Sequence, residues 1–133
     1  MKDHLTLYIG RAIEASRKAY VLYSNYQVGA LLVTKDGIGY TGCNVENASY
    51  PASICAERTA LVKAVSEGER EFAGIVVATA NGGSPCGVCR QMLYEFSPEM
   101  AVITVTFDGD VVLDTTLEQL LPSGFGPNNL PRA

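Results

Sequence analysis

The chain has little of what would mark a nucleic-acid-binding, membrane or disulfide-rich protein. Its 133 residues include no Trp and a single His, and its 10 Lys and Arg are outnumbered by 14 Asp and Glu. The net charge of −4 argues against a polyanionic partner, since phosphate contacts need clustered Lys and Arg. No apolar run approaches the length of a membrane span, and the first residues predict no signal peptide. We therefore expect a soluble cytoplasmic protein whose few cysteines bind metal rather than form disulfides.

Length and composition predict one domain over residues 1–133 with a single continuous core, since 47% of residues are hydrophobic and 18% are charged. Periodicity and turn residues predict helices at 3–22, 54–68, 86–96 and 116–121, and strands at 28–34, 38–44, 73–79, 101–107 and 111–113. Asp36-Gly37 and Asp108-Gly109 are typical of hairpin turns. The order αββαβαββα predicts one mixed sheet covered by helices.

Two cysteine segments carry most of the functional signal. Cys55 and Glu57 lie at the start of one predicted helix, and Cys86-x-x-Cys89 lies at the start of the next. A C-x-x-C pair and a distant third Cys can supply three ligands to a tetrahedral Zn²⁺, and a catalytic site leaves the fourth position to water. Glu57 is then a natural acid/base for that water. The pattern favours a hydrolytic zinc centre.

Three thiolates around one Zn²⁺ leave a net negative charge, which opposes loss of a proton from water. The starts of two helices carry partial positive charge, and Arg58 and Arg90 lie close by in the sequence. We expect Arg58 to be a partner of a thiolate or carboxylate beside the metal. From its position alone, a solvated helix face is an equally good interpretation.

Two other classes of protein are compatible with the cysteines. Cys43 is a fourth thiol, and with Cys55, Cys86 and Cys89 it could close a structural zinc site in a binding module without activity. A dithiol redox protein could instead use the C-x-x-C pair alone, but the third Cys and the adjacent Glu57 would then have no role.

Several segments resemble the small, homotetrameric cytidine deaminases. Residues 41–50 (TGCNVENASY) and 55–60 (CAERTA) resemble their first zinc region, and 85–91 (PCGVCRQ) resembles the second. Segments 24–30 and 120–122 also resemble family positions, so the similarity spans most of the chain. The resemblance implies a three-layer αβα sandwich with a five-stranded mixed sheet. It also implies a homotetramer whose active sites are shared between subunits.

The resemblance assigns roles to individual residues. Zn²⁺ would be held by Cys55, Cys86 and Cys89. Glu57 would move protons from water to N3 of cytosine and to the departing amine, and the backbone N–H of Ala56 would bind the pyrimidine O2. Ribose hydroxyls would be held by Asn44 and Glu46.

Aromatic residues and the surroundings of the zinc complete the predicted site. Tyr26 lies where the family has a ring-stacking aromatic, and Phe125 resembles one that a neighbouring subunit supplies. Tyr50 is expected at a subunit interface. Arg58 and Gln91 are expected beside the zinc ligands.

The expected reaction is zinc-dependent hydrolysis of cytidine and 2′-deoxycytidine to uridine and 2′-deoxyuridine, with release of ammonia, in pyrimidine salvage. A related alternative is deamination of cytosine-bearing antibiotics. The Asn44-x-Glu46 pattern favours a sugar with ordinary hydroxyls. A nucleoside monophosphate is disfavoured because no Gly-rich anion cradle or Arg cluster lies near the site.

Overall fold

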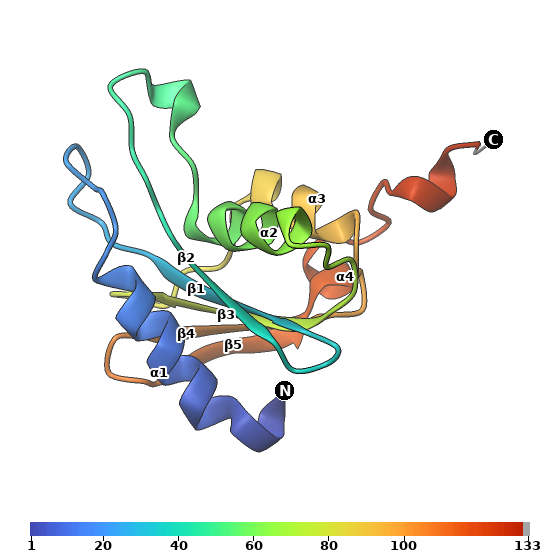
Figure 1. Ribbon diagram of the computed structural model, residues 1–133, viewed down its shortest axis with the longest axis horizontal. Coiled ribbons are helices and arrows are strands. Elements are labelled where there is room, and N and C mark those ends of the chain that lie inside the picture. The colour runs from blue at the N-terminus through green and yellow to red at the C-terminus, as the bar shows by residue number, and fades with distance from the viewer. Residues whose placement is uncertain (132–133) are drawn as a thin grey trace.

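A five-stranded mixed sheet forms the middle layer of the protein (Figure 1). The computed structural model describes residues 1–131. The strands are β1 (Gly29–Thr34), β2 (Gly39–Cys43), β3 (Phe72–Thr79), β4 (Ala101–Thr106) and β5 (Val111–Thr116), in the spatial order β2-β1-β3-β4-β5. β3 and β4 run parallel, and the other neighbouring pairs are antiparallel. The predicted mixed sheet of five strands is confirmed.

Helices cover both faces of this sheet. The helices are α1 (Leu5–Ser16), α2 (Ala56–Ser66), α3 (Gly87–Tyr94) and α4 (Leu117–Leu120), with single 3₁₀ turns at Lys2–His4, Tyr50–Ala52 and Pro127–Asn129. α1 lies alone on one face, and α2, α3 and α4 pack on the other (Figure 1). The three-layer αβα arrangement follows. Among residues 1–131, no helix has both the length and the apolar character that crossing a bilayer requires.

The sheet divides the hydrophobic core into two clusters, one on each face. Side chains alternate between faces along a strand, so neighbouring residues of β1 belong to different clusters. Leu31 and Val33 pack under α1, and Ala30 and Leu32 pack under α2. The single continuous core expected from the sequence is therefore wrong in this detail, because the buried central strands separate its halves.

The first helix is shorter than predicted, ending at Ser16 rather than at residue 22. Beyond it, Tyr20 accepts a hydrogen bond from the Glu46 N–H at 2.8 Å and donates one to the Asn44 carbonyl at 3.0 Å. The chain here pairs with the segment that precedes α2 instead of continuing the helical ladder. Asn25 then takes a left-handed conformation, with φ +57°, as the segment turns back toward β1.

The fifth strand is longer than the predicted 111–113, since it runs to Thr116. β5 pairs with β4 as far as Ala101 of β4, which lies opposite Thr116, and this pairing extends the strand. Most of β5 is exposed or half-buried, so no alternation of apolar residues marks it in the sequence. Both predicted hairpin turns are confirmed, with Gly37 and Gly109 at φ +88° and +89°.

Candidate metal centre

Two helices begin at cysteines on the same side of the sheet. Cys55 is the N-cap residue of α2, Cys86 is the N-cap residue of α3, and Cys89 lies in the first turn of α3. Neither helix, within the described residues, has a side-chain cap at this end. Unpaired N–H groups and the positive ends of both helix dipoles are therefore available to an anionic ligand set.

The three sulfur atoms lie close enough to share one ion. All three Sγ atoms are within 4.8 Å of one another, with Cys55 Sγ 3.8 Å and Cys89 Sγ 3.4 Å from Cys86 Sγ. Zn–S bonds of about 2.3 Å in a tetrahedron place sulfurs about 3.8 Å apart. The triad thus fits three corners of a zinc tetrahedron. Among residues 1–131, the group of potential metal ligands at this place consists of these three cysteines.

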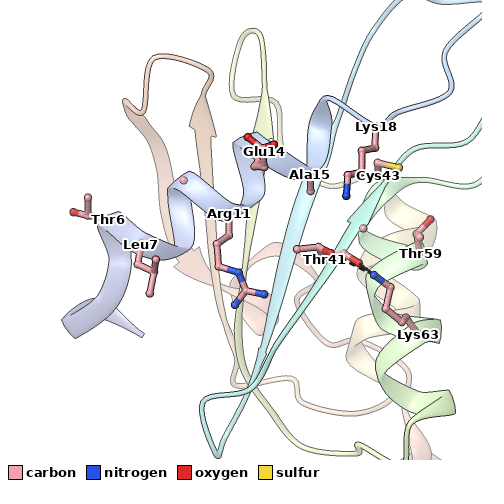
Figure 2. Close-up of a pocket in the computed structure, with 12 residues that line it drawn as sticks. Thr6, Leu7, Arg11, Glu14, Ala15, Lys18, Thr41, Cys43, Thr59 and Lys63 are labelled. Carbon is pink, nitrogen blue, oxygen red and sulfur yellow. Dashed lines mark hydrogen bonds between the residues drawn. The ribbon is translucent and has the colours of Figure 1, made fainter.

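Cys43 belongs to a different part of the molecule. It lines a groove of about 520 Å³ between α1, β2 and α2. Figure 2 shows Cys43 at the end of β2, with Lys18 and Lys63 among the other residues that line this groove. The closed four-cysteine site considered from the sequence is therefore wrong. The clustering of the third thiol, Cys55, with the C-x-x-C pair also disfavours a simple dithiol redox site.

Glu57 follows the first ligand by two residues and is almost completely buried, with 5% of its surface exposed. Burial raises the pKa of its carboxyl to about 7, and the negative charge on Cys55 adds to the rise. A carboxyl that titrates near neutrality can both accept and donate a proton, which suits an acid/base role at this place.

The thiols share protons and contact a cation. A hydrogen bond from the Cys89 thiol holds the pKa of Cys55 at about 5, with a further contribution from Arg58. The same bond and burial raise the pKa of Cys89. Arg58 Nη2 lies 3.4 Å from Cys55 Sγ and 3.5 Å from the carbonyl oxygen of Ser53. The structure thus places Arg58 against a thiolate. Metal binding would displace the shared proton.

A cavity of about 250 Å³ opens beside the triad. Its lining joins Cys55, Ala56, Glu57 and Cys86 to Tyr26, Val28, Asn44, Val77, Thr79, Gly83 and Ser84. The Asn44 side chain braces this wall, since its Oδ1 accepts from the Val28 N–H at 2.9 Å and its Nδ2 donates to the Tyr26 carbonyl at 2.8 Å. The Tyr26 hydroxyl donates to Asn81 Oδ1 at 2.6 Å.

Glu46 and Tyr50 lie in a neighbouring groove of about 440 Å³, which shares Asn44, Cys55 and Arg58 with the site. The Glu46 carboxylate accepts hydrogen bonds from the Ser24 hydroxyl and from the N–H groups of Tyr23 and Ser24. The Ser24 hydroxyl is the main cause of a lowered pKa at Glu46. Tyr50 is 72% exposed, and its ring centre lies 5.9 Å from that of Tyr23.

Phe125, Gln91 and Arg90 line neither the cavity beside the triad nor this neighbouring groove. Phe125 is 56% exposed, and its carbonyl accepts a hydrogen bond from Gln91 Nε2 at 2.8 Å. Arg90, expected to offset thiolate charge, instead donates to the carbonyls of Pro85 and Leu120 and to the Ser84 hydroxyl.

Sequence reasoning missed Ser24, Thr79, Asn81 and Ser84, which line the cavity or brace the residues around it. Asn81 and the two glycines at 82 and 83 predict a loop, but nothing in the sequence indicates that this loop lines the cavity. Thr79, at the end of β3, accepts through its hydroxyl from the N–H groups of Gly82 and Gly83. A polar residue ending a wholly apolar strand was the available signal.

The fold is a mixed β-sheet covered by helices, and its site combines three clustered thiols with a buried carboxyl. Together these features define a zinc-dependent hydrolase. The family model of the cytidine and deoxycytidylate deaminase zinc-binding region matches residues 2–105. The chain belongs to this family, and Cys55, Cys86 and Cys89 are its zinc-binding triad.

Known proteins are similar over nearly the whole chain. A cytidine deaminase of Sporosarcina psychrophila is 44% identical over 128 residues, covering 94% of this chain and 93% of the relative. A cytidine deaminase of Halalkalibacterium halodurans is 47% identical over 120 residues, covering 88% and 90%. The crystal structure of cytidine deaminase from Burkholderia pseudomallei has a TM-score of 0.86 at 47% identity, covering 90% of this chain and 98% of that one.

Proposed function

We propose that this chain hydrolyses cytidine and 2′-deoxycytidine to uridine and 2′-deoxyuridine, releasing ammonia. One observation carries the proposal. Two ligands of the zinc-binding triad, Cys55 and Cys86, line one cavity of about 250 Å³ together with the buried Glu57, beside a first helical turn that has no side-chain cap. The similar proteins named above, which are cytidine deaminases, support the choice of substrate.

Proton transfer is the task of Glu57. When bound, Zn²⁺ supplies Lewis acidity that lowers the pKa of water at its open position. The Glu57 carboxylate accepts the proton of the attacking water and delivers it to N3 of the ring as C4 becomes tetrahedral. Glu57 then accepts the proton of the hydroxyl formed at C4 and passes it to the amine, so that the C4–N bond breaks as the C4 carbonyl forms and ammonia leaves. A pKa of about 7 suits both directions of transfer.

The pyrimidine is held between α2 and the wall of the cavity. The backbone N–H of Ala56, in the uncapped first turn of α2, donates to the pyrimidine O2. Tyr26 offers its ring for stacking, which is worth about 1–3 kcal/mol for a base on an aromatic side chain. The bond from its hydroxyl to Asn81 fixes the ring and satisfies the one polar group of the side chain.

Asn44 and Glu46 hold the ribose hydroxyls. Both side chains already brace loops, but each keeps free hydrogen-bonding capacity. An amide carries a second N–H and a second lone pair on its oxygen, and a carboxylate has about four acceptor positions. Because Glu46 lies in the neighbouring groove rather than in the cavity, the sugar extends from the cavity toward that groove.

The active assembly is a homotetramer whose sites are shared between copies. The exposure of Phe125 and Tyr50, together with their absence from the lining of their own chain's triad cavity, supports this arrangement. Phe125 reaches the site of a neighbouring copy, and Tyr50 lies at the interface. All four cysteines are free thiols, which supports action in the reducing cytoplasm.

A direct test follows the ultraviolet change when zinc-loaded protein is incubated with cytidine, 2′-deoxycytidine, cytosine, cytidine monophosphate or a cytosine-bearing antibiotic. We expect turnover of the two nucleosides and little turnover of cytosine, which lacks the sugar that Asn44 and Glu46 contact. Zinc-loaded protein that deaminated neither nucleoside would overturn the proposal. A preference for the antibiotic would instead identify the protein as a deaminase of cytosine-bearing antibiotics.

A further inference from the structure

Arg90 joins the loop before α3 to the C-terminal part of the chain. Its Nε donates to the Pro85 carbonyl at 2.8 Å, its Nη1 to the Leu120 carbonyl at 2.8 Å, and its Nη2 to the Ser84 hydroxyl at 2.9 Å. All three nitrogens of the guanidinium are therefore used. The backbone N–H of Arg90 also donates to the Cys86 carbonyl at 3.0 Å, as part of the first turn of α3.

Cys86 is the zinc ligand with the least support from packing. Cys89 is fully buried and Cys55 is half-buried, whereas Cys86 is exposed. Gly87, which follows it, and Ser84, two residues before it, are exposed as well, and Pro85 between Ser84 and Cys86 is the buried residue of this stretch. The position of its sulfur therefore depends on how firmly the backbone on either side is held.

We propose that Arg90 is a positioning residue of the zinc centre, which fixes Cys86 by holding the two residues before it. The contact with Pro85 orients the peptide that leads directly into the ligand. The contact with Ser84 holds a residue of the cavity wall, and the contact with Leu120 anchors the guanidinium to the start of the C-terminal segment. Groups that orient metal ligands typically change metal affinity by about 10–100-fold when removed.

The shape of the guanidinium matters as much as its charge. A planar fork with several fixed N–H groups can reach three acceptors in different directions, and a lysine ammonium at the end of a flexible stem cannot reproduce that geometry. The Arg90→Lys variant therefore separates the positioning role from a general effect of positive charge near thiolates.

The experiment measures zinc affinity by competition with a chelator, using purified full-length protein whose fold is checked by circular dichroism. We expect Arg90→Ala and Arg90→Lys to bind zinc about 10–100-fold more weakly. Ser84→Ala, which removes one of the three contacts, should weaken binding less. In the cobalt-substituted protein, Arg90→Lys should also shift the thiolate absorption bands, because the geometry at Cys86 changes.

Arg70 provides a matched control. It also donates to backbone carbonyls, those of Val65 and Glu69, but at the other end of α2. Arg70→Ala should leave zinc affinity and the cobalt spectrum unchanged. If Arg90→Ala does not fold, Arg90→Lys decides alone. A folded Arg90→Lys with wild-type zinc affinity and an unchanged cobalt spectrum overturns the proposal. Activity toward cytidine does not enter, so this result is independent of the proposed substrate.

Discussion

The starts of α2 and α3 contribute to one zinc site but are held in place by different forces. The start of α2 is packed, with Ala56 fully buried against the sheet and Glu57 almost so. The start of α3 is exposed at Cys86 and Gly87, and hydrogen bonds from Arg90 hold the loop that leads into it.

Packing and hydrogen bonding should respond differently to substitution. A close-packed region transmits any change in volume, so damage at α2 should lower the free energy of unfolding. A hydrogen-bonded loop can move locally, so damage at α3 should lower metal affinity while the fold persists. Substitutions at the start of α2 should therefore change mainly the free energy of unfolding, and substitutions at the start of α3 should change mainly the affinity for zinc.

The largest expected effect is loss of the ion itself. Cys89→Ala in α3 and Cys55→Ala in α2 should each abolish stoichiometric zinc binding and all turnover, since both remove a ligand of the same ion. Zinc per chain, measured by atomic absorption, checks the result. Cys43→Ala is the control and should keep both zinc and activity. Zinc loss in that variant would restore the four-cysteine site.

The second prediction concerns proton transfer by Glu57, which lies in the first turn of α2. Glu57→Gln should reduce turnover of cytidine by about 10²–10⁴-fold, because an amide cannot transfer the proton. Zinc content should stay at the wild-type level, since Glu57 is not a ligand. Full activity in the zinc-loaded variant would remove Glu57 from the mechanism.

The third prediction tests the packing of α2. A Cβ atom at Gly42 would lie 2.4 Å from the Ala56 carbonyl oxygen and 2.5 Å from the Ala60 backbone nitrogen. Gly42→Ala should therefore destabilise the fold by about 1–3 kcal/mol, as overpacking does. Denaturant unfolding checks this value. Gly10→Ala, in the middle of α1 with nothing within 4 Å, should stabilise by about 1 kcal/mol. Unchanged stability in Gly42→Ala would contradict the packed view of α2.

The smallest effect concerns the loop that leads toward α2. The lowered pKa of Glu46 means that its contacts with Ser24 and Tyr23 stabilise the fold above the ordinary carboxyl value of 4.5 and weaken as pH falls through the lower folded value. Glu46→Gln should therefore be less stable than wild type at pH 7, and the difference should shrink in acid. Denaturant midpoints at both pH values measure it. A difference that grew in acid would have the wrong sign.

The sequence alone predicted the five strands and the order of elements, because apolar runs are local signals. It also predicted the zinc triad, because the C-x-x-C pair is a local signal and Cys55 stands beside Glu57 at the start of another predicted helix. It did not predict the end of α1 at Ser16, since apolar residues continue at helical spacing to Ala19. Pairing of Tyr20 with the segment before α2 overrides that local preference, and only the tertiary fold reveals it.

Contacts between distant residues were also beyond the reach of sequence reasoning. Arg58 had two equally good interpretations until the fold placed its guanidinium beside Cys55. The hydroxyl of Tyr26 donates a hydrogen bond to Asn81, which lies 55 positions further along the chain. Such contacts form because the sheet brings distant loops together, and the spacing of residues along the sequence does not predict them.

The thiols at the starts of α2 and α3 link the stability of two helix starts to one ion. Sulfur is a weak hydrogen-bond acceptor, so Cys55 and Cys86 are poor substitutes for the Ser, Thr, Asp or Asn that usually begins a helix. An ion bridging them cross-links two segments 31 positions apart and anchors both opening turns at once. Zinc therefore stabilises both opening turns together, and its removal should loosen the two helix starts at the same time.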